Sequence, residues 1–413
     1  MAVRRRGPVV LVALLAGALA LAAACTQDPE PSASDERTDR LARPGMHAID
    51  PPPLSERRDE VRVAAGDRLL IWGGQSAGDS MTGVTFGDGA VLDVTTGRWS
   101  EVSESPFPHG LFSATGVFDG EEFVIVGTEC DEQIPAPTTG DLPVCTGPAA
   151  AAWVPSRDSW RRLPAPPLDT DRFGVPRLIA ASPAVGSDGT AVFVDRLDGA
   201  AITWDRDNDR WGTVESPLGD GSWYCADPTQ PWVVAVSGFD NEPGDLVSVL
   251  RPGQSAWSQV APVDRRLGLT ATCGGGRFVT TDFNGRDSSS AMIDPLTGAA
   301  TEVLPDLPSD RVAEAVVAGP WLFVQTTPMP EIVGTTTTAL GEALAGAQQR
   351  PDGRTMSVQL LPDGPPVPPR TESNVYTLTS PWATYVGRGI VICDLARPDE
   401  CRMWVPPPGA TPE

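Results

Sequence analysis

From residue 61 onward, short apolar runs alternate with turn residues in a pattern that predicts β-strands. The clearest unit contains Val61–Ala65, a Gly66–Asp67 turn, Arg68–Trp72, a longer loop, Gly89–Asp93 and a last strand that begins near Trp99. This unit therefore has four strands, and an aromatic residue lies at the start of the fourth. Helical periodicity is scarce, so the pattern predicts an all-β fold.

The same unit recurs about every 40–50 residues, and such a period is typical of β-propellers. Later units keep the order of strands, although the loop between the second and third strands varies in length. The strands expected in them are 113–117, 122–126, 150–154 and Trp160; 178–181, 191–195, 201–204 and Trp211; 223–225, 233–237, 246–250 and Trp257; 270–273, 277–281, 291–293 and Val303; 313–317, 321–325 and about 356–361; and Val375, 383–386, 389–393 and Trp404.

These units resemble the kelch repeat. The resemblance lies in the Gly73-Gly74 pair after a second strand, the Asp-x-x-Thr-x-x-Trp run from Asp93 to Trp99, and proline followed by arginine in the connectors. It covers about residues 61–408 and implies a β-propeller of four-stranded antiparallel blades. The number of units predicts seven blades. Another all-β solenoid or a sandwich is the alternative.

The N-terminal segment predicts export. Arg4–Arg6 precede an uncharged, mainly apolar stretch that ends at Ala24, which is the pattern of a signal peptide over residues 1–24. Leu21-Ala-Ala-Ala-Cys25 resembles the lipobox of bacterial lipoproteins, which implies that Cys25 is acylated and holds the protein on the outer side of the bacterial cell membrane. An ordinary secretory signal is the alternative. Residues 25–60 are rich in Asp, Glu, Ser, Pro and Arg, and we expect a disordered tether there.

The net charge of the chain limits the classes of molecule that we expect it to bind. The chain of 413 residues carries a formal charge of −23 and has no lysine. Removal of residues 1–24, which carry three arginines and no acid, makes the charge more negative by three. Such a charge repels nucleic acid and anionic headgroups, so neither is expected as a general partner. We expect a monomer that meets the membrane through lipidated Cys25 and binds a glycan, peptide or envelope protein.

The numbers of cysteines and histidines limit the disulfides and metal sites that we expect. An acylated Cys25 leaves six cysteines, and an even number in an exported protein predicts disulfides. With two histidines and no CxxC pair, no metal site is expected, and no cofactor is assigned. By spacing, the expected disulfides join Cys130 with Cys145 and Cys393 with Cys401, which leaves Cys225 and Cys273.

One face of the predicted propeller carries the candidate site. The loops from second to third strands and the connectors between blades emerge on the same face, and the long segments 75–88, 128–148 and 326–354 are all such loops. Basic residues follow prolines in four connectors, where they would attract carboxylate, sulfate or phosphate groups. The alternative is that each pairs with a local acid. These candidate ligand-binding residues are His109, Arg172, Arg266 and Arg311.

The function predicted from fold resemblance is therefore binding through the long-loop face of a lipid-anchored, extracytoplasmic propeller. The alternative is a metal-independent carbohydrate-active enzyme, an isomerase, lyase or hydrolase on the same scaffold. A purely structural spacer is a third class. No catalytic residue is assigned, because the separation of carboxylates in space cannot be read from the sequence.

Overall fold

The structure of the protein is a computed structural model. It describes residues 38–76, 84–130, 145–168, 184–185, 190–194, 201–215, 222–226, 233–237, 247–250, 254, 256–259, 270–274, 277–281, 290–294, 297, 299–303, 311–318, 321–327, 354–360, 375–376, 382–393 and 401–406.

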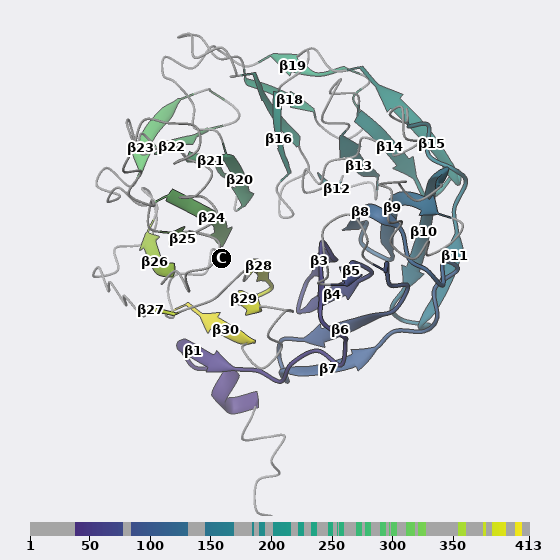
Figure 1. The fold of residues 1–413 in the computed structure, drawn as a ribbon. Helices are drawn as coiled ribbons and strands as arrows, with labels where there is room; N and C mark the ends of the chain where they lie inside the picture. The colour runs from purple at the N-terminus through teal and green to yellow at the C-terminus, as the bar shows by residue number, and fades with distance from the viewer. Residues whose placement is uncertain are drawn as a thin grey trace, which may run out of the picture.

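Within this part of the chain, the strands form seven four-stranded antiparallel sheets arranged as a ring around a central axis (Figure 1). We call each sheet a blade and number the blades from 1 to 7. The first strands of neighbouring blades contact one another along most of the ring, so these strands lie innermost. The all-β, seven-bladed propeller predicted from the sequence is confirmed.

Blades 1 to 3 have the following strands, from the innermost to the outermost: β3 (Val61–Ala65), β4 (Arg68–Trp72), β6 (Gly89–Asp93) and β7 (Arg98–Glu101); β8 (Phe112–Phe118), β9 (Phe123–Cys130), β10 (Cys145–Val154) and β11 (Ser159–Arg162); β12 (Ala184–Val185), β13 (Ala191–Val194), β14 (Ala201–Asp205) and β15 (Arg210–Val214).

Blades 4 to 7 continue the ring with β16 (Ser222–Ala226), β17 (Val233–Ser237), β18 (Val247–Leu250) and β19 (Ser258–Gln259); β20 (Thr270–Gly274), β21 (Arg277–Thr281), β22 (Ser290–Ile293) and β23 (Ala300–Val303); β24 (Arg311–Ala318), β25 (Trp321–Thr327), β26 (Arg354–Leu360) and β27 (Val375–Tyr376); and β28 (Trp382–Val386), β29 (Gly389–Cys393), β30 (Arg402–Val405) and β1 (Gly45–Ala48).

The second strands of the blades are apolar on both faces because each blade packs between two others. Leu69, Leu70, Ile71 and Trp72 are all fully buried, although they alternate between the two faces of blade 1. Leu69 and Ile71 pack against blade 7, whereas Leu70 and Trp72 pack against blade 2. The continuous apolar run in the sequence therefore indicates a strand that neighbouring blades cover on both faces.

The N-terminal segment corrects the predicted domain boundary. β1 pairs with β30, with Met46 opposite Trp404, and supplies the outermost strand of blade 7. Residues 38–60 therefore belong to the folded body, and the prediction of a tether as far as residue 60 was wrong. The physical reason is that the last repeat of the chain supplies only three strands, and the third would otherwise present an open edge.

Two strand assignments change with this closure. Val375–Tyr376, predicted to open the seventh unit, is the outermost strand of blade 6, and Trp404 lies on a third strand instead of a fourth. In blade 3 the innermost described strand is Ala184–Val185, whereas the predicted strand at 178–181 lies outside the described residues. The other predicted strands agree with the structure to within a few residues.

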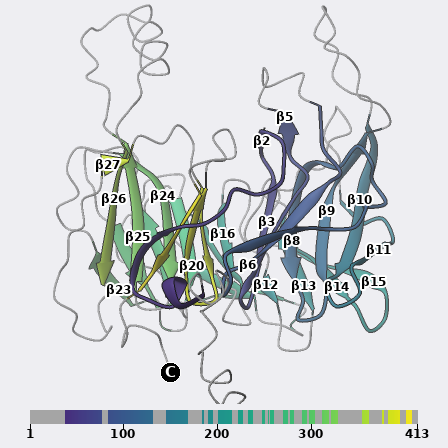
Figure 2. The same cartoon turned by 90° about the horizontal axis from the view of Figure 1, so that it is seen from below.

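The propeller has two faces with different kinds of connection. The face with connectors and second-to-third-strand loops, called the loop face, carries the small sheet of β2 (Arg57–Arg58) and β5 (Gln75–Ser76), which projects at the top of Figure 2. The opposite face, called the turn face, carries the tight turns such as 66–67, 94–97 and 387–388. No helix among the described residues is long and apolar enough to cross a membrane.

Candidate functional site at the loop face

Arg57 is a fully buried cation at the loop-face end of blade 1. Its guanidinium donates to both carboxylate oxygens of Asp88, at 2.8 and 3.1 Å, and to the carbonyl oxygens of Ser55 and Gly73. The guanidinium carbon also lies 4.4 Å from the centroid of the Phe86 ring. These contacts satisfy the charge locally, so Arg57 fastens the segment before blade 1 onto the loop between β4 and β6.

Arg58 is less well satisfied than Arg57. Its Nε and Nη2 atoms are buried and have no hydrogen-bond partner, and the nearest carboxylate oxygen, of Asp59, lies 3.9 Å from Nε. About a third of the side chain is exposed. Buried donors without acceptors are rare and energetically unfavourable, and they often mark functional positions. Arg58 is therefore the described loop-face cation that an incoming anion would satisfy.

Glu60 is buried two residues after Arg58, directly before innermost strand β3. Burial raises the pKa of its carboxyl group, and the nearby Arg62, at 3.7 Å, lowers it by a smaller amount. A carboxyl group with a raised pKa in this position can carry a proton at a higher pH than an exposed glutamate can. The corner at Arg58 and Glu60 thus combines a partly unsatisfied cation with a buried carboxyl group of raised pKa.

Two glycines give this corner its shape. Gly73 and Gly74 have positive φ values of 70° and 91°, which side chains rarely adopt. A Cβ atom on Gly74 would also lie 2.8 Å from the carbonyl oxygen of Arg58. The Gly-Gly pair noted in the sequence therefore turns the chain after β4 so that β5 can pair with β2 beside Arg58.

Of the four predicted ligand-binding residues, the structure describes the side chain of His109 alone. His109 is exposed, and its carbonyl oxygen accepts a hydrogen bond from the Thr85 hydroxyl. This bond holds the connector between blades 1 and 2 against the loop that also carries Phe86 and Asp88, so His109 belongs to the same part of the loop face as Arg57. Arg172 and Arg266 lie outside the described residues, and Arg311 begins innermost strand β24, where only its backbone is described.

Sequence reasoning missed Arg57 and Arg58 because residues 25–60 were assigned to a tether. The signal was present, since proline followed by arginine selected the other connector residues, and Pro51–Pro53 precede Arg57 in the same way. For Arg57 the structure supports the alternative interpretation of the basic connector residues, which is that each pairs with a local acid. Arg58 does not follow that alternative, because Asp59 provides only a long contact.

The disulfides are described in part. Cys393 is bonded to Cys401, as predicted. Cys130 and Cys273 are also disulfide-bonded. The register of β9 and β10 places Cys145 opposite Cys130, and Cys225 and Cys273 lie on neighbouring innermost strands, β16 and β20. These placements agree with the two remaining pairings, which stay predictions, as does acylation of Cys25, a residue outside the described part of the chain.

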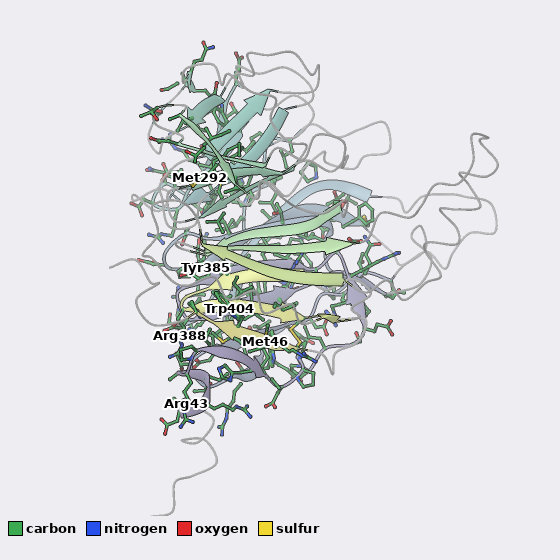
Figure 3. The ribbon with its side chains drawn as sticks, turned by 90° about the vertical axis from the view of Figure 1, so that its left-hand side faces the viewer. Arg43, Met46, Met292, Tyr385, Arg388 and Trp404 are labelled. Carbon is green, nitrogen blue, oxygen red and sulfur yellow. A yellow bond between two sulfur atoms is a disulfide. The ribbon has the colours of Figure 1, made fainter. Side chains whose placement is uncertain are left out.

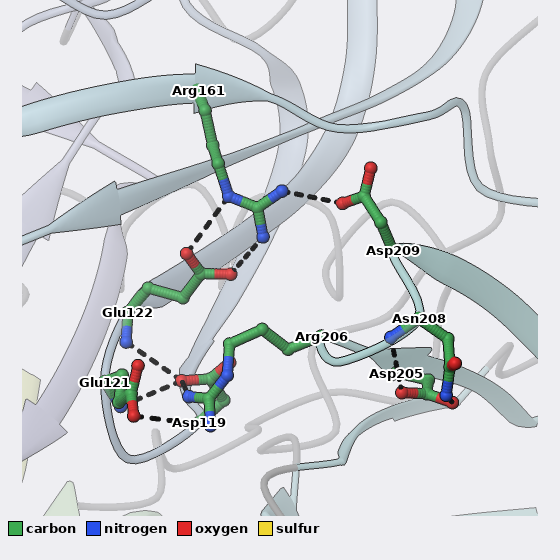
Figure 4. A network of polar contacts seen from close by, with 8 residues as sticks. All are labelled: Asp119, Glu121, Glu122, Arg161, Asp205, Arg206, Asn208 and Asp209. Carbon is green, nitrogen blue, oxygen red and sulfur yellow. Dashed lines mark hydrogen bonds and ion pairs between the residues drawn. The ribbon is translucent and has the colours of Figure 1, made fainter.

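A second polar cluster, at the turn face between blades 2 and 3, has a structural role (Figure 4). Asp119 is buried and accepts a hydrogen bond from Arg206 at 3.0 Å, while Arg161 binds Glu122 through two nitrogen atoms and Asp209 through a third. Burial raises the pKa of Asp119. The contacts join turns of neighbouring blades and leave the cations paired, so the cluster fastens two blades together.

Among the described residues, no group of three or more His, Cys, Asp or Glu side chains is arranged to hold a metal ion. The candidate site therefore consists of the Arg58–Glu60 corner and the neighbouring exposed His109. Its chemistry suits recognition of an anionic group, with a nearby carboxyl group that can exchange a proton.

One solved structure has a partial likeness to this chain. The solved structure of YjhT, a kelch-repeat β-propeller protein, matches with a TM-score of 0.43 and 12% sequence identity over 68% of this chain and 97% of the YjhT chain. No protein-family model matches the chain, and no curated protein matches it. The likeness to YjhT carries no conclusion about function.

Proposed function

We propose that this protein is an extracytoplasmic lipoprotein, anchored through Cys25, whose loop face binds an anionic ligand at the Arg58–Glu60 corner. The ligand class is a carboxylate-, sulfate- or phosphate-bearing glycan or peptide of the cell envelope. The observation that carries the proposal is Arg58, whose buried Nε and Nη2 donors have no acceptor in the free protein.

The surroundings of Arg58 support an anionic ligand. The chain has 54 acidic residues against 31 arginines, so a cation whose described carboxylate contact is as long as 3.9 Å is a selective feature on this molecule. Arginine binds planar anions through two parallel hydrogen bonds, which gives geometric specificity as well as affinity. A rigid propeller also presents this residue on loops, where binding residues are commonly placed.

The test is thermal unfolding of the chain from residue 25, carrying Cys25→Ser, against a panel of anionic envelope glycans and acidic peptides. A ligand that binds only the folded protein at one hundred times its dissociation constant adds about 2.7 kcal/mol of stability and raises the melting temperature. We expect Arg58→Gln to abolish that shift. Arg210→Gln, which removes an exposed cation 3.6 Å from Asp205 at the turn face, is the matched control and should keep it.

A shift that Arg58→Gln leaves unchanged would contradict the proposed site, and the absence of any shift across the panel would contradict the proposed ligand class.

Anchoring is tested separately. We expect the full-length protein to fractionate with membranes and its Cys25→Ser variant to be released, whereas retention of the variant would contradict lipid attachment.

Glu60 supports a second candidate function, a metal-independent enzyme acting on carbohydrates. A carboxyl group with a pKa raised by burial, close to a cation, is a common arrangement for general acid catalysis. In this mechanism Glu60 would donate a proton to the leaving oxygen, a water molecule would form the new bond to the sugar carbon, and Arg58 would hold an anionic substituent of the sugar. Glu60→Gln should then keep the ligand-induced melting shift but abolish turnover, whereas equal loss of both would favour simple binding.

A further inference from the structure

We propose that the turn face of blades 7, 1 and 2 carries a basic patch that docks on anionic lipid headgroups, so that the loop face points away from the membrane. The patch consists of five arginines that come from the turns of three consecutive blades and from the segment entering β1: Arg43, Arg68, Arg98, Arg157 and Arg388.

Contacts between the turns bring Arg68, Arg98 and Arg388 to one region, and Arg157 lies in the turn between β10 and β11 of the next blade. The guanidinium of Arg388 lies 3.5 Å from the carbonyl oxygen of Val94, in the turn directly before Arg98. In blade 1 the amide of Val94 donates to the carbonyl oxygen of Asp67, which precedes Arg68. In Figure 3, Arg43 and Arg388 lie at the same edge of the ring.

The arginines of the patch lack ion pairs. Among the described residues, no carboxylate lies within ion-pairing distance of a patch arginine, and four of the five side chains are exposed. Arg40 donates to the carbonyl oxygen of Ala48, and seven other described arginines have carboxylate partners. These paired arginines are Arg57, Arg58, Arg62, Arg161, Arg162, Arg206 and Arg210.

The acids nearby reduce the positive charge of the patch but do not cancel it. Asp93 accepts from the amide and hydroxyl of Thr95 in its own turn, and Asp158 accepts from the amide of Ser103 and the indole of Trp153. Both carboxylates keep their negative charge, and Asp67 is exposed among the arginines, so these three acids oppose the five positive charges of the patch.

Screening decides whether the strongly acidic body would prevent docking. At physiological salt the Debye length is about 8 Å, so exposed acids on the far side of the propeller act weakly at the membrane surface. Each basic residue close to an anionic bilayer contributes about 1 kcal/mol. The patch therefore attracts the bilayer locally when the turn face approaches first, while exposed acids between blades 2 and 3 on the same face, Glu121 and Asp209, oppose this attraction.

The corrected boundary of the folded body also favours this orientation. β1 is antiparallel to β30 and enters blade 7 at the turn face, so the chain from Cys25 reaches the body on the patch side. Only twelve residues separate Cys25 from Thr38, and a flexible chain of that length has a mean reach of roughly 20 Å. The orientation depends on the proposed anchor, whereas the affinity of the patch for lipid does not.

The test uses the chain from residue 25 with Cys25→Ser, which keeps every residue that the structure describes, and measures cosedimentation with vesicles. We expect binding to vesicles containing phosphatidylglycerol, weak binding to pure phosphatidylcholine, and loss of binding in high salt. Arg68→Gln combined with Arg98→Gln should weaken the apparent affinity about thirtyfold, since two arginines contribute about 2 kcal/mol.

The control combines Arg162→Gln with Arg210→Gln, which removes the same formal charge from ion-paired arginines outside the patch. We expect it to weaken binding less than threefold. Equal weakening by both double variants, binding that ignores the phosphatidylglycerol content, or no binding at low salt would overturn the proposal. Because the protein used in this test carries no lipid and keeps Arg58 and Glu60, each of these results is independent of the anchor and of ligand binding at Arg58.

Discussion

At the scale of single residues, Arg57 and Asp88 show how a buried cation fixes a loop. Arg57 is inaccessible to solvent, while the Asp88 side chain is more than half exposed. Asp88→Ala would leave the guanidinium buried with only neutral acceptors, from Ser55 and Gly73. We expect a loss of about 2 kcal/mol in the free energy of unfolding, measured by denaturant titration, because hydrogen bonds between charged groups contribute about that much.

Glu101→Ala is the control for that measurement, because Glu101 is an exposed acid at the end of β7 and should change stability by less than about 0.5 kcal/mol. Equal effects of the two substitutions would show that the ion pair with Arg57 does not stabilise the segment before blade 1.

Glu60 predicts a pH dependence of stability. Burial raises its folded-state pKa above the ordinary value for a glutamate, so the folded protein retains this proton at pH values where the unfolded chain has released it. Stability contributed by this group is therefore largest below the unfolded pKa and falls as the pH rises through the folded pKa. Glu60→Gln should reduce that fall when the free energy of unfolding is measured between pH 4 and pH 8.

Glu104→Gln provides the matched comparison, since Glu104 is exposed in the connector after blade 1. Its pH profile should follow that of the parent protein. If the Glu60→Gln profile also follows the parent, then burial does not shift the titration of Glu60, and the case for a general acid at the loop face is lost.

At the scale of elements, the tryptophan at the start of each fourth strand makes the same contact in blades 1, 2 and 3. Its indole nitrogen donates to a carbonyl oxygen in the segment that arrives from the preceding blade. The three bonds run from Trp99 to Asp50 at 2.7 Å, from Trp160 to Ser103 at 2.9 Å and from Trp211 to Pro164 at 2.8 Å. The repeated tryptophan thus fastens each of these three blades to the connector before it.

This contact predicts that Trp160→Phe destabilises the protein by about 1–2 kcal/mol, from the lost hydrogen bond and reduced aromatic packing against Trp72. Trp99→Phe and Trp211→Phe should have similar effects, since they remove the same bond. Thermal unfolding of the three variants measures this. A loss confined to one variant would show a local contact instead of a repeated one.

The sequence predicted those strands whose apolar pattern follows directly from burial between neighbouring blades. The runs Leu69–Trp72 and Phe123–Val126 are apolar because neighbouring blades cover both faces, and Gly66 or Gly120 marks the turn beside each run. Gly45–Ala48 has no such pattern, because an outermost strand buries little and depends on pairing with a strand more than 350 residues later. Pairing over that distance is a property of the closed ring and leaves no local signal.

The sequence predicted which face of the propeller carries the candidate site, but it did not identify the principal residues of that site. His109 lies on the loop face, as expected from its connector. Arg58 was missed because its importance comes from two buried atoms without acceptors, and only the three-dimensional arrangement shows which arginines are paired. The basic patch at the turn face was missed for the same reason, since its arginines are scattered from position 43 to position 388.

At the scale of the whole molecule, the ring is closed by strands from both ends of the chain. β1 completes blade 7, and the fully buried Leu41 packs in the cluster between blades 7 and 1 together with Leu69 and Val391. Without residues 38–49, β30 would be an open edge and this cluster would be exposed on one side. Edge strands of that kind promote association with other chains.

We therefore predict that a chain beginning at residue 50 has a lower melting temperature than one beginning at residue 38, and that it associates at high concentration. Removing Leu41 alone, as Leu41→Ala, should cost about 2–5 kcal/mol because it leaves a cavity in the closing cluster. A synthetic peptide of residues 38–49, added to the shortened chain, should restore the melting temperature by re-forming the pairing of Met46 with Trp404. Equal melting temperatures for the two chains would mean that blade 7 is stable with three strands, and the ring would then not depend on its N-terminal strand.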